Sequence, residues 1–256
     1  MGKLFLFNFI LILFIAIGLW IVRNCVKHER TKNLILFAAA IFTILFHYSI
    51  VGYKLLTGSN VLAYLGDTPN LLLPIYPCNV VMWSALIFAL IKNKESKIGM
   101  FFADYLFWFG IVSTLVGMFA NVDFINNPTL ADYGNLKSIV AHATLLFNIL
   151  LLAIFGYIKI DVKRNIMNII ISVILMAIIG GYCNLVFGAL VSPEAAYEVN
   201  SMFLIHSPFE GAAFLTYPVI ALIAIPIYFI LFALCDLIVH KKGTRFFDKT
   251  VKKQKP

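Results

Sequence analysis

A succession of long apolar stretches constrains this chain more than any other feature. A hydrocarbon core of roughly 30 Å requires about 20 apolar residues in each helix that crosses it. Stretches that meet this requirement cover residues 4–22, 33–56, 71–91, 99–120, 136–158, 165–190 and 214–239. A mean hydropathy of +0.94 with 12% charged residues also lies outside the range of soluble domains. The sequence therefore predicts an all-α, polytopic membrane bundle of about seven transmembrane helices.

The Lys and Arg residues predict how such a bundle is oriented, because cytoplasmic loops and tails collect positive charge. Only Lys3, Lys54 and Lys137 fall on one side of the predicted membrane, and the other 17 of the 20 fall on the opposite side. We therefore expect the N-terminus outside and the C-terminus in the cytoplasm. The net charge of +8 follows from this asymmetry. It gives no reason to expect a nucleic-acid partner.

Little chain remains between the apolar stretches, and the sequence contains neither repeats nor Ser/Gly-rich linkers. We expect a single transmembrane domain over residues 1–240, followed by a basic cytoplasmic tail over residues 241–256. The first apolar stretch is too long for a signal peptide and lacks a small-residue cleavage site before Arg23, so it is interpreted as a retained span. The predicted location is the cell membrane, as a multi-pass integral protein.

Four polar side chains from four different stretches are predicted to share one depth in the membrane. With a helix rise of 1.5 Å per residue, Cys78, His142 and Asn184 lie about 9–10 Å from the outer boundary, and His47 lies about 13 Å from it. Polar groups at such a depth are expected to face the bundle interior or a wet cavity. Pro74 and Pro77 additionally favour a helix start that places Cys78 in the first turn, where the helix dipole stabilises a thiolate.

A thiol beside an imidazole favours acyl transfer, because the thiolate is a strong nucleophile and the imidazole accepts its proton. The ester linkages of phospholipids lie just beneath the headgroups, at the depth expected for Cys78 and His142. We expect Cys78 to attack a phospholipid ester and form a thioester, with His142 as the base. A lyso-lipid or water then accepts the acyl group, while His47 and Asn184 orient the imidazole or bind the oxyanion.

Three other interpretations use the same residues. The polar layer is also typical of interhelical hydrogen bonds that stabilise a bundle. Cys78, His47 and His142 have the residue types of a zinc site with one open position, although no HxxxH pair supports it. A small-molecule or lipid binding or transport protein would use the same polar cavity. For the acyl-transfer interpretation we expect no cofactor and no metal.

The chain also resembles the YwaF-like integral membrane protein family, the bacterial relatives of transmembrane protein 164. The resemblance runs over most of the length and is carried by Phe46-His47-Tyr48, Leu73-Pro74-Ile75-Tyr76-Pro77-Cys78, Ala141-His142, Asn184 with Gly188-Ala189, and Asn200-Ser201-Met202-Phe203-Leu204. It implies a cysteine-dependent phospholipid acyl-transfer site at Cys78 with His142. His47, Asn184 and Asn200 would be the supporting residues.

Overall fold

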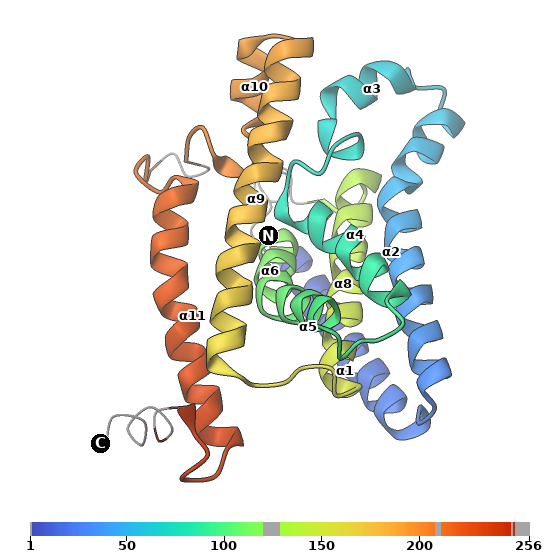
Figure 1. Cartoon of the computed structure of the whole chain (residues 1–256). Coiled ribbons are helices and arrows are strands. Elements are labelled where there is room, and N and C mark those ends of the chain that lie inside the picture. Colours follow the sequence, from blue (N-terminus) through green and yellow to red (C-terminus); the bar gives the residue numbers. More distant parts are fainter. Residues whose placement is uncertain (1, 120–128, 208–210, 247, 249–256) are drawn as a thin grey trace. The chain divides into compact units, whose positions relative to one another are not determined.

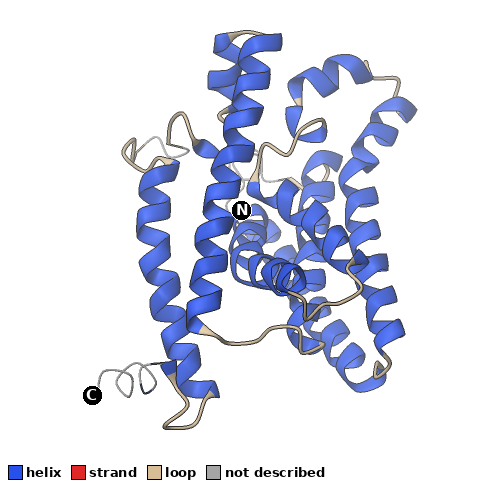
Figure 2. Cartoon of the chain, viewed as in Figure 1, coloured by secondary structure: helices blue, strands red, loops and turns tan. Residues whose placement is uncertain are grey.

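The computed structural model describes residues 2–119, 129–207, 211–246 and 248, and within them it contains helices and no strand (Figure 2). Each long helix follows one of the apolar runs, because a helix satisfies every backbone hydrogen bond within itself and a bilayer offers no other partner. The chain divides into two compact units, residues 1–158 and 159–256. The predicted division at residue 240 stays a prediction.

The first unit is a bundle around one enclosed helix, α8 (Figure 1). Its elements are α1 (Gly2–Cys25), α2 (Glu29–Leu56), α3 (Val61–Asp67), the 3-10 turn η1 (Pro69–Leu71), α4 (Pro77–Leu90), α5 (Lys97–Asp104), the π-helical turn η2 (Tyr105–Phe109), α6 (Gly110–Phe119) and α8 (Tyr133–Ile154). Helix α8 packs against α1, α2, α4 and α6, and α2 also packs against α4. The N-terminal ends of α4 and α8 therefore lie in one bundle, together with α2.

The second unit is smaller and consists of long helices joined by a compact connection. Its elements are α9 (Val162–Leu190), α10 (Pro193–Val199), the 3-10 turn η3 (Ser201–Phe203) and α11 (Tyr217–Val239). Helix α9 packs against α10, η3 and α11.

The predicted helical bundle is confirmed: six helices among the described residues are long and apolar enough to cross a membrane. The stretch expected over residues 71–91 differs, because its helix is α4, with 14 residues. Such a helix is about 21 Å long, which is less than the hydrocarbon thickness. Pro74 and Pro77 account for the shortening, since proline donates no backbone hydrogen bond and is tolerated only at a helix start.

Candidate functional site

Cys78 lies in the first turn of α4, as the position of Pro77 predicts. Asn79 fixes this turn, because its Oδ1 accepts a hydrogen bond from the backbone N–H of Tyr76 at 3.2 Å. Asn79 is only 4% exposed, whereas Cys78 is partly exposed. The backbone N–H of Asn79 donates to the Tyr76 oxygen at 3.0 Å, which closes the same turn. Cys78 therefore lies at the positive end of the α4 dipole.

His47 projects from α2 into the same bundle and is 9% exposed. The edge of its ring packs on Tyr48, with ring centroids 5.0 Å apart. The Nε2 atom is buried and has no hydrogen-bond partner among the residues that the structure describes. A buried polar atom without a partner is rare in proteins and needs an explanation, such as a ligand or a catalytic role.

His142 projects from α8 toward α6. Its Nδ1 lies 2.7 Å from the backbone oxygen of Ser138, which only accepts hydrogen bonds, so Nδ1 carries the proton and Nε2 is the acceptor. The imidazole lies directly against Gly117, where an added Cβ would be 2.2 Å from both Nε2 and Cδ2. Glycine at position 117 therefore makes the space that the imidazole occupies.

A further polar residue of the first unit is Lys137 of α8, which is 7% exposed. The first unit carries Cys78, His47 and His142 on α4, α2 and α8, three helices that pack on one another. These three residues are called the cluster around Cys78. The His142 ring is bonded to Ser138, and no hydrogen bond among the described residues joins the Cys78 thiol to the imidazole.

Sequence reasoning did not identify Lys137 as part of a site, because it counted this residue only as a charge at the outer end of a span. The structure places it at 7% exposure, in the second turn of α8. A signal was present in the sequence. Lys137 follows the start of an apolar run and precedes His142 by five residues, so it lies within the predicted span rather than in the loop before it.

Asn184 and Asn200 both lie in the second unit, where each of them fixes a connection between helices. Asn184 accepts from the backbone N–H of Ser201 at 2.7 Å and donates to its oxygen at 3.4 Å. Asn200 has a left-handed backbone with φ of 43°, donates to the His206 oxygen at 2.9 Å, and accepts from the N–H of Ile205 at 3.0 Å. Their amide groups therefore hold the α10–η3 connection to α9. Roles for them in orienting His142 stay predictions.

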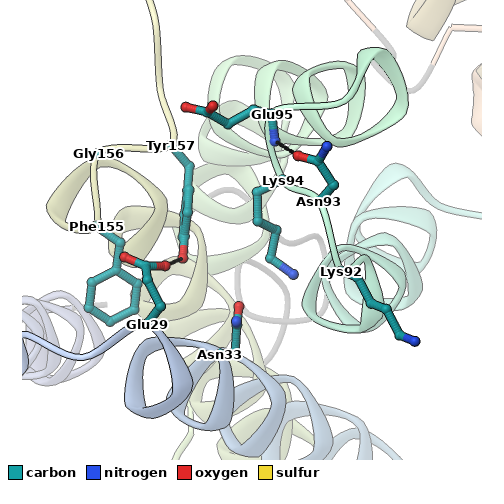
Figure 3. Close-up of a pocket in the computed structure, with 9 residues that line it drawn as sticks. All are labelled: Glu29, Asn33, Lys92, Asn93, Lys94, Glu95, Phe155, Gly156 and Tyr157. Carbon is teal, nitrogen blue, oxygen red and sulfur yellow. Dashed lines mark hydrogen bonds between the residues drawn. The ribbon is translucent and has the colours of Figure 1, made fainter.

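A polar pocket occupies the opposite end of the first unit, where α2 begins and α4 and α8 end (Figure 3). Lys94 reaches into it and donates hydrogen bonds to the backbone oxygens of Phe88, Ala89 and Ile91, at the C-terminal end of α4. Burial lowers the pKa of Lys94 to about 8. These three hydrogen bonds make Lys94 the cap of α4.

Tyr157 and Glu29 form a second contact in this pocket. The Tyr157 hydroxyl donates to Glu29 Oε2 at 2.9 Å, and burial together with this carboxylate raises the pKa of Tyr157.

The zinc alternative requires Cys78, His47 and His142 to converge on one point. Within the residues that the structure describes, no group of three or more His, Cys, Asp or Glu side chains lies close enough to hold a metal ion. The cluster around Cys78 therefore lacks the geometry of a three-ligand zinc site.

Comparison with known proteins identifies one family for the chain and supports the membrane bundle. No curated protein and no solved structure matches the chain. The profile of the TMEM164 family matches residues 3–238, which include all five residues of the predicted site. This match and the six apolar helices establish a multi-pass membrane protein. On the strength of a match over nearly its whole length, the chain belongs to the TMEM164 family.

Proposed function

We propose that this protein is a membrane-embedded phospholipid acyltransferase in which Cys78 is the nucleophile and His142 the general base. It would be a YwaF-like member of its family and would act from the outer half of the cell membrane. A phospholipid would donate the acyl chain, and a lyso-lipid or another hydroxyl compound would accept it. The proposal needs neither a cofactor nor a metal.

The observation that carries the proposal is the position of the Cys78 sulfur at the first turn of α4. The first turn of a helix carries the positive end of the helix dipole, which favours a thiolate there. Reactive cysteines occur at helix N-termini and are partly exposed, as Cys78 is, whereas structural cysteines are enclosed by apolar groups. Cys183 provides the contrast within this chain, because it is 1% exposed on α9.

The two histidines supply acceptors for the proton that acyl transfer must move. The His142 tautomer that Ser138 selects leaves Nε2 able to accept a proton. The buried Nε2 of His47 has no hydrogen-bond partner in the described part of the chain. The His142 acceptor is not bonded to the thiol in the unliganded protein. Catalytic hydrogen bonds often tighten only when the substrate is bound, so this geometry is compatible with the role.

The proposed reaction has two balanced steps. His142 accepts the thiol proton, and the Cys78 sulfur attacks the ester carbonyl. The C–S bond forms, the ester C–O bond breaks, and the proton passes from the imidazolium to the departing lyso-lipid oxygen. In the second step an acceptor hydroxyl gives its proton to His142 and attacks the thioester, the C–S bond breaks, and the imidazolium returns the proton to the Cys78 sulfur. The backbone N–H of Cys78, in the first turn of α4, is a donor suited to the oxyanion of either step.

The test is transfer of a deuterated acyl chain from phospholipid to lyso-lipid in vesicles that contain the purified protein. Cys78→Ser should lower the transfer rate by about 1,000-fold or more, because a serine hydroxyl is a much weaker nucleophile. His142→Gln should lower it by about 100-fold to 10,000-fold, the usual contribution of a general base. Cys25→Ala, which removes an exposed thiol at the end of α1, should leave the rate unchanged.

A binding or transport protein would respond differently to the same variants. Its lipid affinity would tolerate the change from sulfur to oxygen at Cys78. Transfer by Cys78→Ser at the wild-type rate, or no transfer by any variant combined with retained lipid binding, would contradict the acyltransferase and favour the binding protein.

A further inference from the structure

An apolar groove runs along α2 where this helix packs on α8. Its volume is about 410 Å³, which lies within the range of ligand-binding sites in proteins. The groove is lined by apolar side chains and one threonine, all from α2 and α8: Ile35, Ala38, Ala39, Phe42, Thr144 and Phe147. The two alanines leave the space, because the groove residues on either side of them along α2 are large.

The groove offers no free polar group to a ligand. The Thr144 hydroxyl is already bonded, since it donates to the Ala141 oxygen at 3.0 Å and accepts from the Thr43 hydroxyl at 3.1 Å. Phe147 closes the groove on the side of α1, because a Cβ added at Gly18 would lie 3.1 Å from its ring. Both α2 and α8 are long and apolar enough to cross a membrane, so hydrocarbon chains surround the groove. An acyl chain therefore fits it.

One end of the groove lies close to a basic turn. Ile35 is the groove residue nearest the start of α2, about 9 Å along the axis from Glu29. Residues 26–28 join α2 to α1 at this end. Residues 23–32 contain four Lys or Arg side chains and one carboxylate, that of Glu29, which Lys32 binds at 2.5 Å. The turn therefore keeps an excess of positive charge.

Three cations of this turn are available to an anion. Lys27, in the turn itself, donates to the Arg23 backbone oxygen at 2.9 Å, and one such bond leaves other N–H donors of its ammonium group. Arg23 and Arg30 are exposed and form no ion pair among the residues that the structure describes. Guanidinium groups bind phosphate through two parallel hydrogen bonds, and a lysine binds it as a point charge. A phosphate therefore matches this end of the groove.

The groove is separate from the acyl-transfer residues. Thr144 follows His142 by two residues, which is about 200° around the axis of α8. The two side chains thus leave α8 on opposite faces, and His142 lies against Gly117 of α6. A ligand in the groove would not occupy the place of the substrate.

We propose that this groove binds one anionic phospholipid of the surrounding bilayer, with an acyl chain between α2 and α8 and the phosphate at Lys27, Arg23 and Arg30. Each Lys or Arg near a membrane surface strengthens the attraction of an anionic headgroup by about fivefold. The groove adds a fixed position for the chain, whereas charges alone attract headgroups without holding one of them.

The test is native mass spectrometry of the full-length protein in detergent, titrated with phosphatidylglycerol or with phosphatidylcholine of the same acyl chains. A Cys78→Ala background prevents acyl transfer from consuming the lipid, so the result does not depend on the proposed function. The protein should bind one phosphatidylglycerol about 25-fold or more tightly than phosphatidylcholine, and Lys27→Gln/Arg30→Gln should remove about 25-fold of this affinity. Lys54→Gln/Lys97→Gln removes two charges elsewhere in the first unit and should keep the preference.

A second variant fills the groove itself. Ala39→Leu should weaken binding of both lipids by about tenfold, because its side chain takes the space of the acyl chain. The matched control is Ala153→Leu, at an exposed position of α8 outside the groove, which should change neither affinity. Melting temperatures show whether each variant is folded.

Three results would overturn the inference. The first is equal affinity of the protein for the two lipids, and the second is an unchanged preference in Lys27→Gln/Arg30→Gln. The third is a lipid-free dimer that Ala39→Leu dissociates, which would assign the groove to a second copy of the chain.

Discussion

Replacing Gly117 by alanine tests the position of His142 without changing any reacting group. The added Cβ would lie 2.2 Å from Nε2 and Cδ2 of the imidazole, whereas non-bonded carbon atoms normally stay about 3.5 Å apart. The imidazole therefore has to move by about 1.3 Å. It cannot move toward α6, so we expect it to rotate away from Gly117 and to lose the hydrogen bond from Nδ1 to the Ser138 oxygen.

The size of the effect follows from these contacts. Overpacking lowers the free energy of unfolding by about 1–3 kcal/mol, and the lost hydrogen bond lowers it by about 1 kcal/mol. The higher helix propensity of alanine raises it by up to about 1 kcal/mol. We expect Gly117→Ala to lower the free energy of unfolding by about 1–3 kcal/mol. A base displaced by more than 1 Å should lower the rate of acyl transfer by about 100-fold.

Thermal unfolding in detergent and the vesicle transfer assay measure the two effects separately. Gly52→Ala on α2 is the matched control, because nothing lies within 4 Å of the Cβ it would add. The double variant Gly117→Ala/His142→Ala removes the clash, so its stability should recover while its activity stays at the level of His142→Ala. Wild-type stability and activity in Gly117→Ala would refute the described position of His142 or its role as the base.

Three further predictions concern the residues that support the fold around the sites. Burial places the pKa of Lys94 at about 8, below its ordinary value, so the unfolded chain binds this proton more tightly and the Lys94-dependent stability rises with pH. The stability of wild type relative to Lys94→Met, measured by unfolding, should therefore increase between about pH 7.5 and 9.5, and a decrease would contradict this. Asn200→Ala should destabilise the second unit by about 1 kcal/mol more than Asn200→Gly, because only alanine is strained at φ of 43°, and equal melting temperatures would argue against that strain. Asn79→Ala should cost about 1 kcal/mol of stability and slow alkylation of Cys78, because the first turn of α4 loses its cap; an unchanged alkylation rate would show that the cap does not position the thiol.

The apolar runs predicted most of the helices, because a bilayer permits few alternatives to a helix. The run over residues 165–190 became α9 (Val162–Leu190), and the run over residues 214–239 became α11 (Tyr217–Val239). The run over residues 71–91 was less informative. Hydropathy does not distinguish a helix from an extended apolar segment, and Pro74 and Pro77 delay the start of α4 to Pro77.

The candidate site was predicted in part. Cys78, His47 and His142 were identified because polar residues in apolar runs are conspicuous, and depth along a helix is simple to count. Rotation about the helix axis and side-chain direction are not determined by depth. For that reason the sequence did not show that Lys137 turns inward, that His142 packs on Gly117, or that Asn184 bonds the backbone of Ser201.

The most direct measurement of the central claim is intact-protein mass spectrometry after incubation with phospholipid vesicles and rapid quenching. Acyl transfer through Cys78 predicts an added mass equal to one acyl chain, removed by neutral hydroxylamine, absent in Cys78→Ala and reduced in His142→Ala. Peptide mapping should place the adduct on Cys78, with Cys25 unmodified. Transfer of acyl chains to lyso-lipid by protein that never carries this adduct, or that carries it equally in Cys78→Ala, would contradict the claim.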